Sequence, residues 1–174
     1  MLGANANRFR GADRPVERVR WGHAQGFCHK LGDLEDASYR LPTEAEWEHA
    51  CRAGTRTRFF WGDDAERAGE FAWSRANSGG ETHPVRRLLP NPWGLFDMAG
   101  NVYEWCADVY DPRVYARRTF RTKDPAPNPG TGEHVVRGGC FESSAVELRS
   151  AMRRRYRDDY KTYLRGFRVA RSAL

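Results

Sequence analysis

Residues 91–108 decide the fold, and they read Asn91-Pro-Trp-Gly-Leu-Phe-Asp-Met-Ala-Gly-Asn-Val-Tyr-Glu-Trp-Cys-Ala-Asp108. A Pro-Trp-Gly turn leads into an apolar run, and a Gly-Asn corner interrupts that run. The run resumes as Val-Tyr-Glu-Trp, which sets Glu104 between two aromatic residues. Burying a carboxylate without a partner costs several kcal/mol. Some other group must therefore neutralise Glu104.

The partner of Glu104 is either an arginine or a hard cation, and the residues alone leave both open. Asp97 and Glu104 supply carboxylates, and a turn at Gly100 and Asn101 can aim backbone carbonyls at the same point. Calcium prefers such a set, because it binds about six to eight oxygen ligands in a flexible geometry. A buried ion pair is equally compatible with a chain this rich in arginine.

The same stretch resembles the signature of the formylglycine-generating enzyme (sulfatase-modifying factor) family. Further segments match that family in the same order along the chain, from about Asn7 to Arg171. They are Arg40-Leu-Pro-Thr-Glu-Ala-Glu-Trp-Glu48, Val136-Arg-Gly-Gly139, and Leu148-Arg-Ser-Ala151 followed by Gly166-Phe-Arg168.

The resemblance implies an α+β, C-type-lectin-like fold with two short helices, small sheets and many loops. It also implies a structural calcium site formed by Asp97, the carbonyls of Gly100 and Val102, and Glu104. With the resemblance added, a bound calcium ion becomes the favoured partner of Glu104.

A single domain is expected over residues 1–174, because this length suits one hydrophobic core. The likeness begins at a point already well into the family's domain, so we expect a shortened N-terminus without the family's first strand. That strand would pair with the end of the chain. An exposed sheet edge beside Phe167 and Val169 would then invite a partner chain or a second copy.

Composition excludes several classes of protein. No apolar run approaches the roughly 20 residues that span a membrane, and no signal pattern opens the chain, so we expect a cytoplasmic protein. The four cysteines (Cys28, Cys51, Cys106 and Cys140) are far apart, which argues against a zinc knuckle and indicates buried free thiols. The net charge of +6 comes from the residues after Val136, and the rest of the chain is neutral. Without a nucleic-acid-binding module or a continuous basic run, these arginines are expected to pair within the fold rather than bind nucleic acid.

Apolar spacing and turn residues place the secondary structure. A helix is predicted over about 22–31, and a second over about 44–52, with Thr43 and Glu46 forming a capping box. The second helix should bury Ala45, Trp47, Ala50 and Cys51 and leave its glutamates at the surface. Strands are predicted over 59–62, 135–141 and 166–171, and long loops over 74–92 and 111–134.

A ligand-binding surface is predicted between the last two of these strands, where Arg and Tyr residues are concentrated. Such side chains are typical of recognition surfaces, and a protein or a small ligand would suit them. A solvated, salt-bridged loop is the alternative. The candidate residues are Phe141, Glu142, Ser143, Arg155, Tyr156, Arg157, Asp159 and Tyr160.

Enzymatic activity is the remaining question. Family enzymes oxidise a substrate cysteine to formylglycine with oxygen, at a copper ion held by two cysteines. The resemblance places that pair at Ser143 and about Leu148, and neither residue can supply a thiolate. Cys140 is a weak catalytic candidate, because one thiol does not replace a pair. We therefore expect no copper and favour a non-catalytic, calcium-stabilised module that binds a ligand or a protein. An oxidoreductase acting on sulfatases is the alternative.

Overall fold

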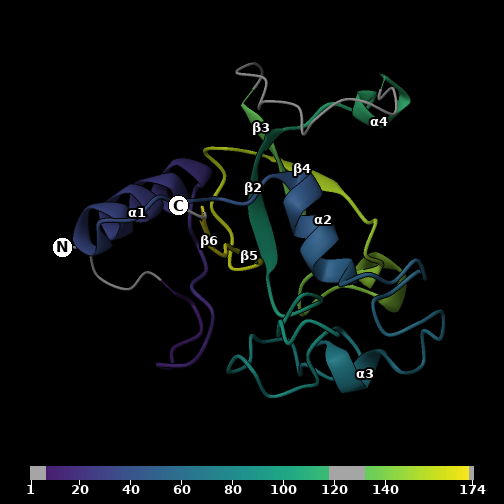
Figure 1. Ribbon diagram of the computed structural model, residues 1–174. Helices are drawn as coiled ribbons and strands as arrows, with labels where there is room; N and C mark the ends of the chain where they lie inside the picture. The colour runs from purple at the N-terminus through teal and green to yellow at the C-terminus, as the bar shows by residue number, and fades with distance from the viewer. Residues whose placement is uncertain (1–6, 118–131, 173–174) are drawn as a thin grey trace.

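A four-stranded sheet lies at the centre of the computed structural model, which describes residues 7–117 and 132–172 (Figure 1). Its strands follow the order β4–β3–β2–β5, with β2 and β5 parallel and the other neighbours antiparallel. A separate two-stranded sheet pairs β1 with β6. The strand bounds are β1 Tyr39–Arg40, β2 Tyr103–Val109, β3 Glu133–Arg137, β4 Arg154–Arg157, β5 Arg165–Gly166 and β6 Ala170–Arg171.

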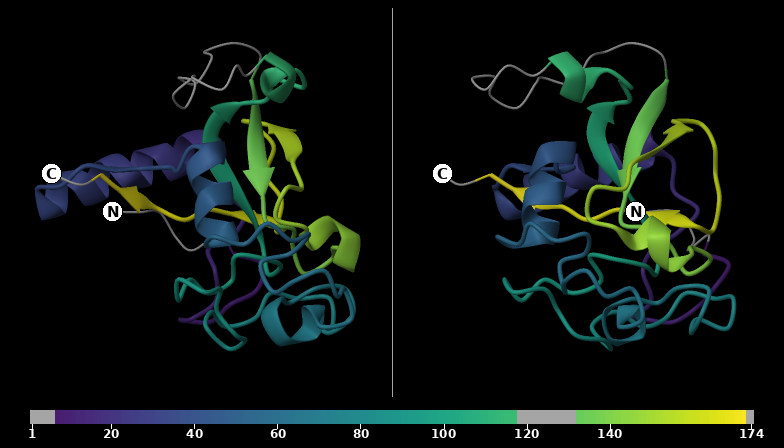
Figure 2. Two further views of the ribbon diagram at one scale, coloured as in Figure 1. Left: turned by 45° about the vertical axis from the view of Figure 1, so that its right-hand side comes forward. Right: turned by 90° about the vertical axis from the view of Figure 1, so that its right-hand side faces the viewer.

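Two helices longer than one turn accompany the sheets in the described residues, and long loops join the elements (Figure 2). None of the helices in this part of the chain is long and apolar enough to cross a membrane. The helix bounds are α1 Trp21–Glu35, α2 Glu44–Arg52, α3 Ala68–Phe71 and α4 Val114–Arg117, with a 3₁₀ turn at Ala145–Leu148.

The two long helices cover opposite faces of the sheet, because side chains alternate between the faces along a strand. Trp105 of β2 packs in one cluster with α1, whereas Cys106, the next residue, packs in another with α2. Val136 and Val135 of β3 divide in the same way. In Figure 1, α1 and α2 accordingly lie on either side of β2.

The strand register places Glu104 at the centre of the sheet. It lies opposite Arg137 of β3 on one side and Gly166 of β5 on the other. A side chain at position 166 would collide with the backbone carbonyl of Val16. The chain around Val16 therefore lies so close to β5 that position 166 must be a glycine.

The prediction for α2 is confirmed in its bounds and its cap. The Thr43 hydroxyl accepts a hydrogen bond from the Glu46 amide, and the Glu46 carboxylate accepts one from the Thr43 amide. Trp47 is buried as expected. The glutamates were expected at the surface, and Glu44 contradicts this because it is buried beside Arg137 of β3 and Arg153, which precedes β4.

Two predicted strands differ from those observed. Residues 59–62 form a tight turn closed by one bridge between Phe59 and Gly62 instead of a strand. The predicted strand over 135–141 begins earlier and ends at Arg137, because Gly138 and Gly139 adopt positive φ angles of 90° and 78°. Such angles leave the extended conformation.

The predicted terminal strand over 166–171 is two short strands in different sheets. Its start is β5, which pairs with β2, and its end is β6, which pairs with β1. Beside β6, Val169 is exposed and Phe167 packs against Phe27 with ring centroids 5.3 Å apart. A cavity of about 630 Å³ adjoins this sheet. The addition of another chain at this edge stays a prediction.

The first predicted helix is longer than expected, and the long loop is only partly described. The apolar pattern ends at Leu31, but α1 continues to Glu35 and is closed by Asp36 in a left-handed conformation, whose amide bonds the Gly32 carbonyl. Residues 74–92 lie outside every helix and strand, as predicted. Of the predicted loop over 111–134, residues 118–131 fall outside the described chain, and α4 and the start of β3 occupy its ends.

Candidate functional site

Glu104 is neutralised by an arginine within the fold. The Arg168 guanidinium donates to both carboxylate oxygens, with Nε–Oε2 and Nη2–Oε1 distances of 2.5 Å and 2.6 Å. The indole Nε1 of Trp47 donates to Oε2 at 2.6 Å. Of the two partners that the residues alone allowed for Glu104, an arginine or a cation, the structure contains the arginine. Arg168 belongs to the matching segment at the end of the chain, but its pairing with Glu104 depends on the strand register.

The residues predicted to bind calcium lie together around one cavity of about 390 Å³. Asp97, Gly100, Val102 and Glu104 all contribute to its lining, as does Arg168. Only two of them offer carboxylates, and the described residues hold no cluster of three or more His, Cys, Asp and Glu side chains arranged for a metal. A calcium ion here would consequently need backbone carbonyls as well as carboxylates among its ligands.

Asp97 is the carboxylate in this cavity for which the structure gives no arginine ion pair. Its Oδ2 accepts a hydrogen bond from the Arg86 amide at 2.8 Å, and Oδ1 lies 3.4 Å from the Asn101 side-chain nitrogen. Burial raises the pKa of Asp97, with a smaller contribution from the charge of Glu104. Two carboxylates and two guanidinium groups line the cavity, because Arg86 contributes as well as Arg168, so the charges of its lining balance. The oxygen donors of Asp97 and Glu104 are of the kind that calcium binds.

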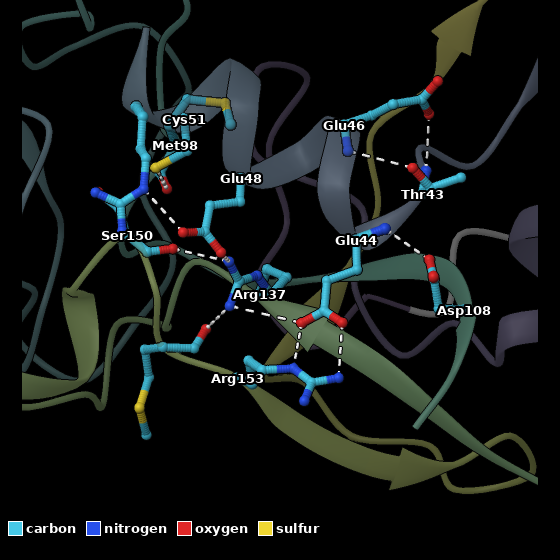
Figure 3. A network of polar contacts seen from close by, with 12 residues as sticks. Thr43, Glu44, Glu46, Glu48, Cys51, Met98, Asp108, Arg137, Ser150 and Arg153 are labelled. Carbon is cyan, nitrogen blue, oxygen red and sulfur yellow. Dashed lines mark hydrogen bonds and ion pairs between the residues drawn. The ribbon is translucent and has the colours of Figure 1, made fainter. Parts of the chain in front are cut away.

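A second buried ion network joins α2 to the strands on its face of the sheet (Figure 3). Glu44 accepts hydrogen bonds from Arg153 through both carboxylate oxygens, one of them at 2.7 Å. Arg137 binds the Glu48 carboxylate and the carbonyls of Met152 and Ser150, at 2.7 Å and 2.9 Å for the carbonyls. Several of the C-terminal arginines therefore pair within the fold.

The two positions at which the resemblance places copper-binding cysteines are buried. The Ser143 hydroxyl accepts a hydrogen bond from the Cys140 amide at 3.1 Å and lies 3.2 Å from the Tyr103 hydroxyl. Leu148 packs in the core beside α2. The Cys140 thiol lies 3.7 Å from the Ser143 hydroxyl, and burial raises the pKa of that thiol. This cluster brings together one thiol, one serine hydroxyl and one phenol.

The predicted ligand-binding residues separate into an inner and an outer group. Phe141 and Ser143 are buried, Glu142 and Tyr156 are partly exposed, and the others are exposed. Arg155 lies over the Tyr110 ring with its guanidinium carbon 5.1 Å from the centroid, and Arg157 pairs with Asp159 at 3.2 Å. The exposed members come from β4 and the turn that follows it.

One notable residue escaped the sequence analysis. Arg165 is buried on β5, between the partly exposed Tyr156 and the exposed Tyr160. The signal that could have found it is a charged residue beside Gly166, in a segment otherwise expected to be apolar core.

The amino-acid sequence matches a known protein family and several characterised relatives. Residues 2–173 match the FGE-sulfatase family, described as a sulfatase-modifying factor enzyme 1-like domain. The chain is 39% identical over 164 residues to the serine/threonine-protein kinase pkn1 of Chlamydia pneumoniae, covering 92% of this chain and 24% of that protein. It is 36% identical over 187 residues to the formylglycine-generating enzyme of Streptomyces coelicolor, covering 98% of this chain and 57% of that enzyme. The chain thus spans less than two thirds of the length of either relative.

Solved structures show the same fold. Treponema denticola variable protein 1 superposes with a TM-score of 0.87 at 27% identity, over 97% of this chain and 77% of that chain. PvdO from Pseudomonas aeruginosa superposes with a TM-score of 0.84 at 26% identity, over 95% and 64% of the two chains. These likenesses confirm the predicted α+β, loop-rich, C-type-lectin-like fold.

Proposed function

This chain belongs to the FGE-sulfatase family of sulfatase-modifying factor enzyme 1-like domains, and we propose that it is a non-catalytic, calcium-stabilised member that binds a protein or a small ligand. The observation that carries this proposal is the identity and burial of Ser143 and Leu148, each only 2% exposed. A copper(I) ion prefers soft thiolate ligands. A serine hydroxyl and a leucine side chain offer none.

The remaining thiols do not compensate for the missing pair. All four cysteines are free and buried. Burial raises the pKa of each thiol, to about 12 for Cys51 and well above its ordinary value for Cys106. Copper binding and nucleophilic attack both require the thiolate, so these burial effects oppose both at neutral pH.

The proposal is tested by titrating the protein with copper(I) while oxygen uptake is measured on a cysteine-containing sulfatase-motif peptide. We expect neither stoichiometric copper binding nor peptide oxidation. Stoichiometric binding with turnover would establish the alternative function, an oxidoreductase that forms formylglycine. The variant Cys140→Ser then shows whether Cys140 is the thiol responsible.

Calcium would be held by Asp97, the carbonyls of Gly100 and Val102, and Glu104, which share one cavity. There it would neutralise the charge of Asp97, whose carboxylate accepts hydrogen bonds only from the Arg86 amide and the Asn101 side chain in the described chain. We expect the melting temperature to be higher with calcium than with a chelator, because a ligand that binds only the folded state stabilises it.

The substitution Asp97→Asn is the sharpest probe of this metal, because asparagine tolerates the positive φ angle of 55° at this position. It should abolish the calcium-dependent rise in melting temperature while leaving the melting temperature in chelator unchanged or higher. Equal melting temperatures for the wild type with calcium and with chelator would refute the metal site.

The binding surface is proposed at β4 and the turn after it. Its exposed residues include Arg155 and Tyr160, side chains that recognition surfaces favour. The likeness to part of a protein kinase supports a module that acts beside other domains.

A further inference from the structure

Arg165 is a buried charge for which the described residues offer no hydrogen-bond partner. The residue is 1% exposed, and its Nε, Nη1 and Nη2 atoms have no partner within the described part of the chain. A guanidinium carries five N–H donors in a rigid planar arrangement. Leaving such donors unsatisfied in the interior is costly, so the arrangement calls for an acceptor.

Aromatic rings enclose the Arg165 guanidinium. Its central carbon lies 4.0 Å from the ring centroid of Tyr156, 4.9 Å from that of Tyr160 and 5.1 Å from that of Trp105. These distances are those of cation–π contacts, which stabilise the positive charge. The ring faces do not replace oxygen acceptors for the N–H donors. We call this enclosure of Arg165 by Trp105, Tyr156 and Tyr160 the aromatic box.

Among the residues that the structure describes, no carboxylate balances the charge inside the aromatic box. Burial lowers the pKa of Arg165 to about 10, and only the phenols of Tyr156 and Tyr160 oppose this effect. The other buried arginine of the sheet, Arg137, has two glutamates beside it. The box thus offers a positive charge with free donors to an acceptor from outside the described chain.

The aromatic box has one wall at the molecular surface. Tyr160 is 58% exposed, whereas Trp105 is fully buried. Tyr160 follows β4 in a stretch, residues 153–161, that contains five basic and two acidic residues. A local excess of positive charge raises the concentration of anions near a surface. Of the three rings, that of Tyr160 is the most exposed, so its displacement would open the guanidinium to solvent.

We propose that Arg165 and the aromatic box form a binding site for an oxyanion, a carboxylate, phosphate or sulfate group that enters past Tyr160 and accepts hydrogen bonds from the guanidinium. The planar donors of arginine suit the bidentate geometry of these groups. The site shares Tyr156 and Tyr160 with the binding surface proposed above and rests on that proposal to this extent. It involves neither the lining of the calcium cavity nor Ser143 and Leu148.

The test compares melting temperatures in sodium phosphate, sulfate, acetate and chloride at equal pH and ionic strength. For the wild type we expect phosphate, sulfate or acetate to raise the melting temperature by about 3 °C or more over chloride at tenfold the dissociation constant. A rise with acetate alone identifies a carboxylate site, and a rise with phosphate and sulfate identifies a tetrahedral-oxyanion site. Equal melting temperatures in all four salts would overturn the proposal.

Substitutions locate the effect. Arg165→Met should remove the anion-dependent rise, and Arg67→Met is the matched control because Arg67 is exposed and paired with Glu70, away from the proposed binding surface. We expect the control to keep the rise. The same rise in Arg165→Met would place the anion elsewhere on the basic surface and overturn the proposal.

A measurement on folded protein covers the case in which Arg165→Met fails to fold. Tyr160→Ala removes the outer wall of the box without altering the guanidinium. Stopped-flow tryptophan fluorescence with the anion that stabilises the wild type should show faster association in Tyr160→Ala than in the wild type. An unchanged association rate would contradict entry past Tyr160.

Discussion

Arg137 and Arg165 occupy comparable places in the sheet but have opposite surroundings. They lie on β3 and β5, the two neighbours of β2, and both are almost fully buried. Each guanidinium lies over an indole ring, Trp47 for Arg137 at 5.4 Å and Trp105 for Arg165 at 5.1 Å. Burial and aromatic contact are therefore nearly the same for the two residues.

Their polar partners differ. Arg137 binds carboxylates from α2 and two backbone carbonyls, and only its Nε lacks a partner in the described chain. Arg165 has no acceptor on any of its nitrogens there. The comparison teaches that burial does not by itself assign a role to a charged residue. Arg137 is a structural link between helix and sheet, whereas Arg165 retains the donors that a ligand needs.

The largest effect is expected where the paired network is broken. Glu44→Gln removes the negative charge beside the buried guanidinium of Arg137 and the partly exposed one of Arg153, so it should lower the free energy of unfolding by about 3 kcal/mol. Denaturant unfolding measures this loss. The matched control is Glu46→Gln on the same helix, because the exposed pair of Glu46 with Arg40 should be worth less than about 1 kcal/mol. Equal losses of unfolding free energy in the two variants would contradict the assignment of Glu44 as a structural partner of Arg137 and Arg153.

An intermediate effect is expected for the ion pair at the centre of the sheet. Glu104→Gln keeps an acceptor for Trp47 and Arg168 but removes the charge, so it should lower the free energy of unfolding by about 2 kcal/mol. The loss should already appear in chelator, since Arg168 pairs with Glu104 directly, and it should be larger with calcium, which Glu104 is proposed to bind. A loss confined to calcium-containing buffer would mean that the metal, not Arg168, neutralises Glu104.

The smallest effect is expected at a buried histidine whose Nδ1 also lacks a partner in the described chain. His134 stacks on Trp21 with ring centroids 3.7 Å apart. Burial lowers the pKa of His134 below its ordinary value of 6.5, although hydrogen bonds to the carbonyls of Asp108 and Ala107 and the charge of Asp158 oppose this. Since the neutral form is favoured in the folded state, its contribution to stability is complete above pH 6.5 and is lost as the pH falls.

The pH effect is measured as the difference in unfolding free energy between the wild type and His134→Phe, which keeps a ring for Trp21. The wild type should lose up to about 1.4 kcal/mol per pH unit relative to the variant as the pH falls from 6.5. Parallel pH profiles would show that His134 does not titrate differently in the folded and unfolded states.

Local features of this fold could be predicted from the sequence. The capping box of α2 joins residues three apart, so Thr43 and Glu46 revealed it directly. The need of Glu104 for a partner was also visible, because aromatic residues on both sides indicated burial. The matching segments then identified the fold as a whole.

Features that depend on distant contacts could not be predicted in the same way. Glu44 is buried because Arg153 reaches it from 109 residues away, and no local pattern encodes that contact. The terminal strand divides between two sheets because β5 and β6 meet different partners. Arg165 looked like one more basic residue, and its lack of an acceptor depends on the rings that β2 and β4 place around it. The calcium ligands remain a prediction that stability measurements must test.

The most direct measurement compares the unfolding free energies of Arg137→Met and Arg165→Met with the wild type in chloride buffer. Arg137→Met removes a buried cation that pairs with Glu44 and Glu48 and donates to two backbone carbonyls, so we expect a loss of about 3–5 kcal/mol. Arg165→Met removes a charge that has no acceptor, so its stability should stay within about 1 kcal/mol of the wild type or exceed it. A loss for Arg165→Met as large as that for Arg137→Met would contradict the account, because both arginines would then be structural.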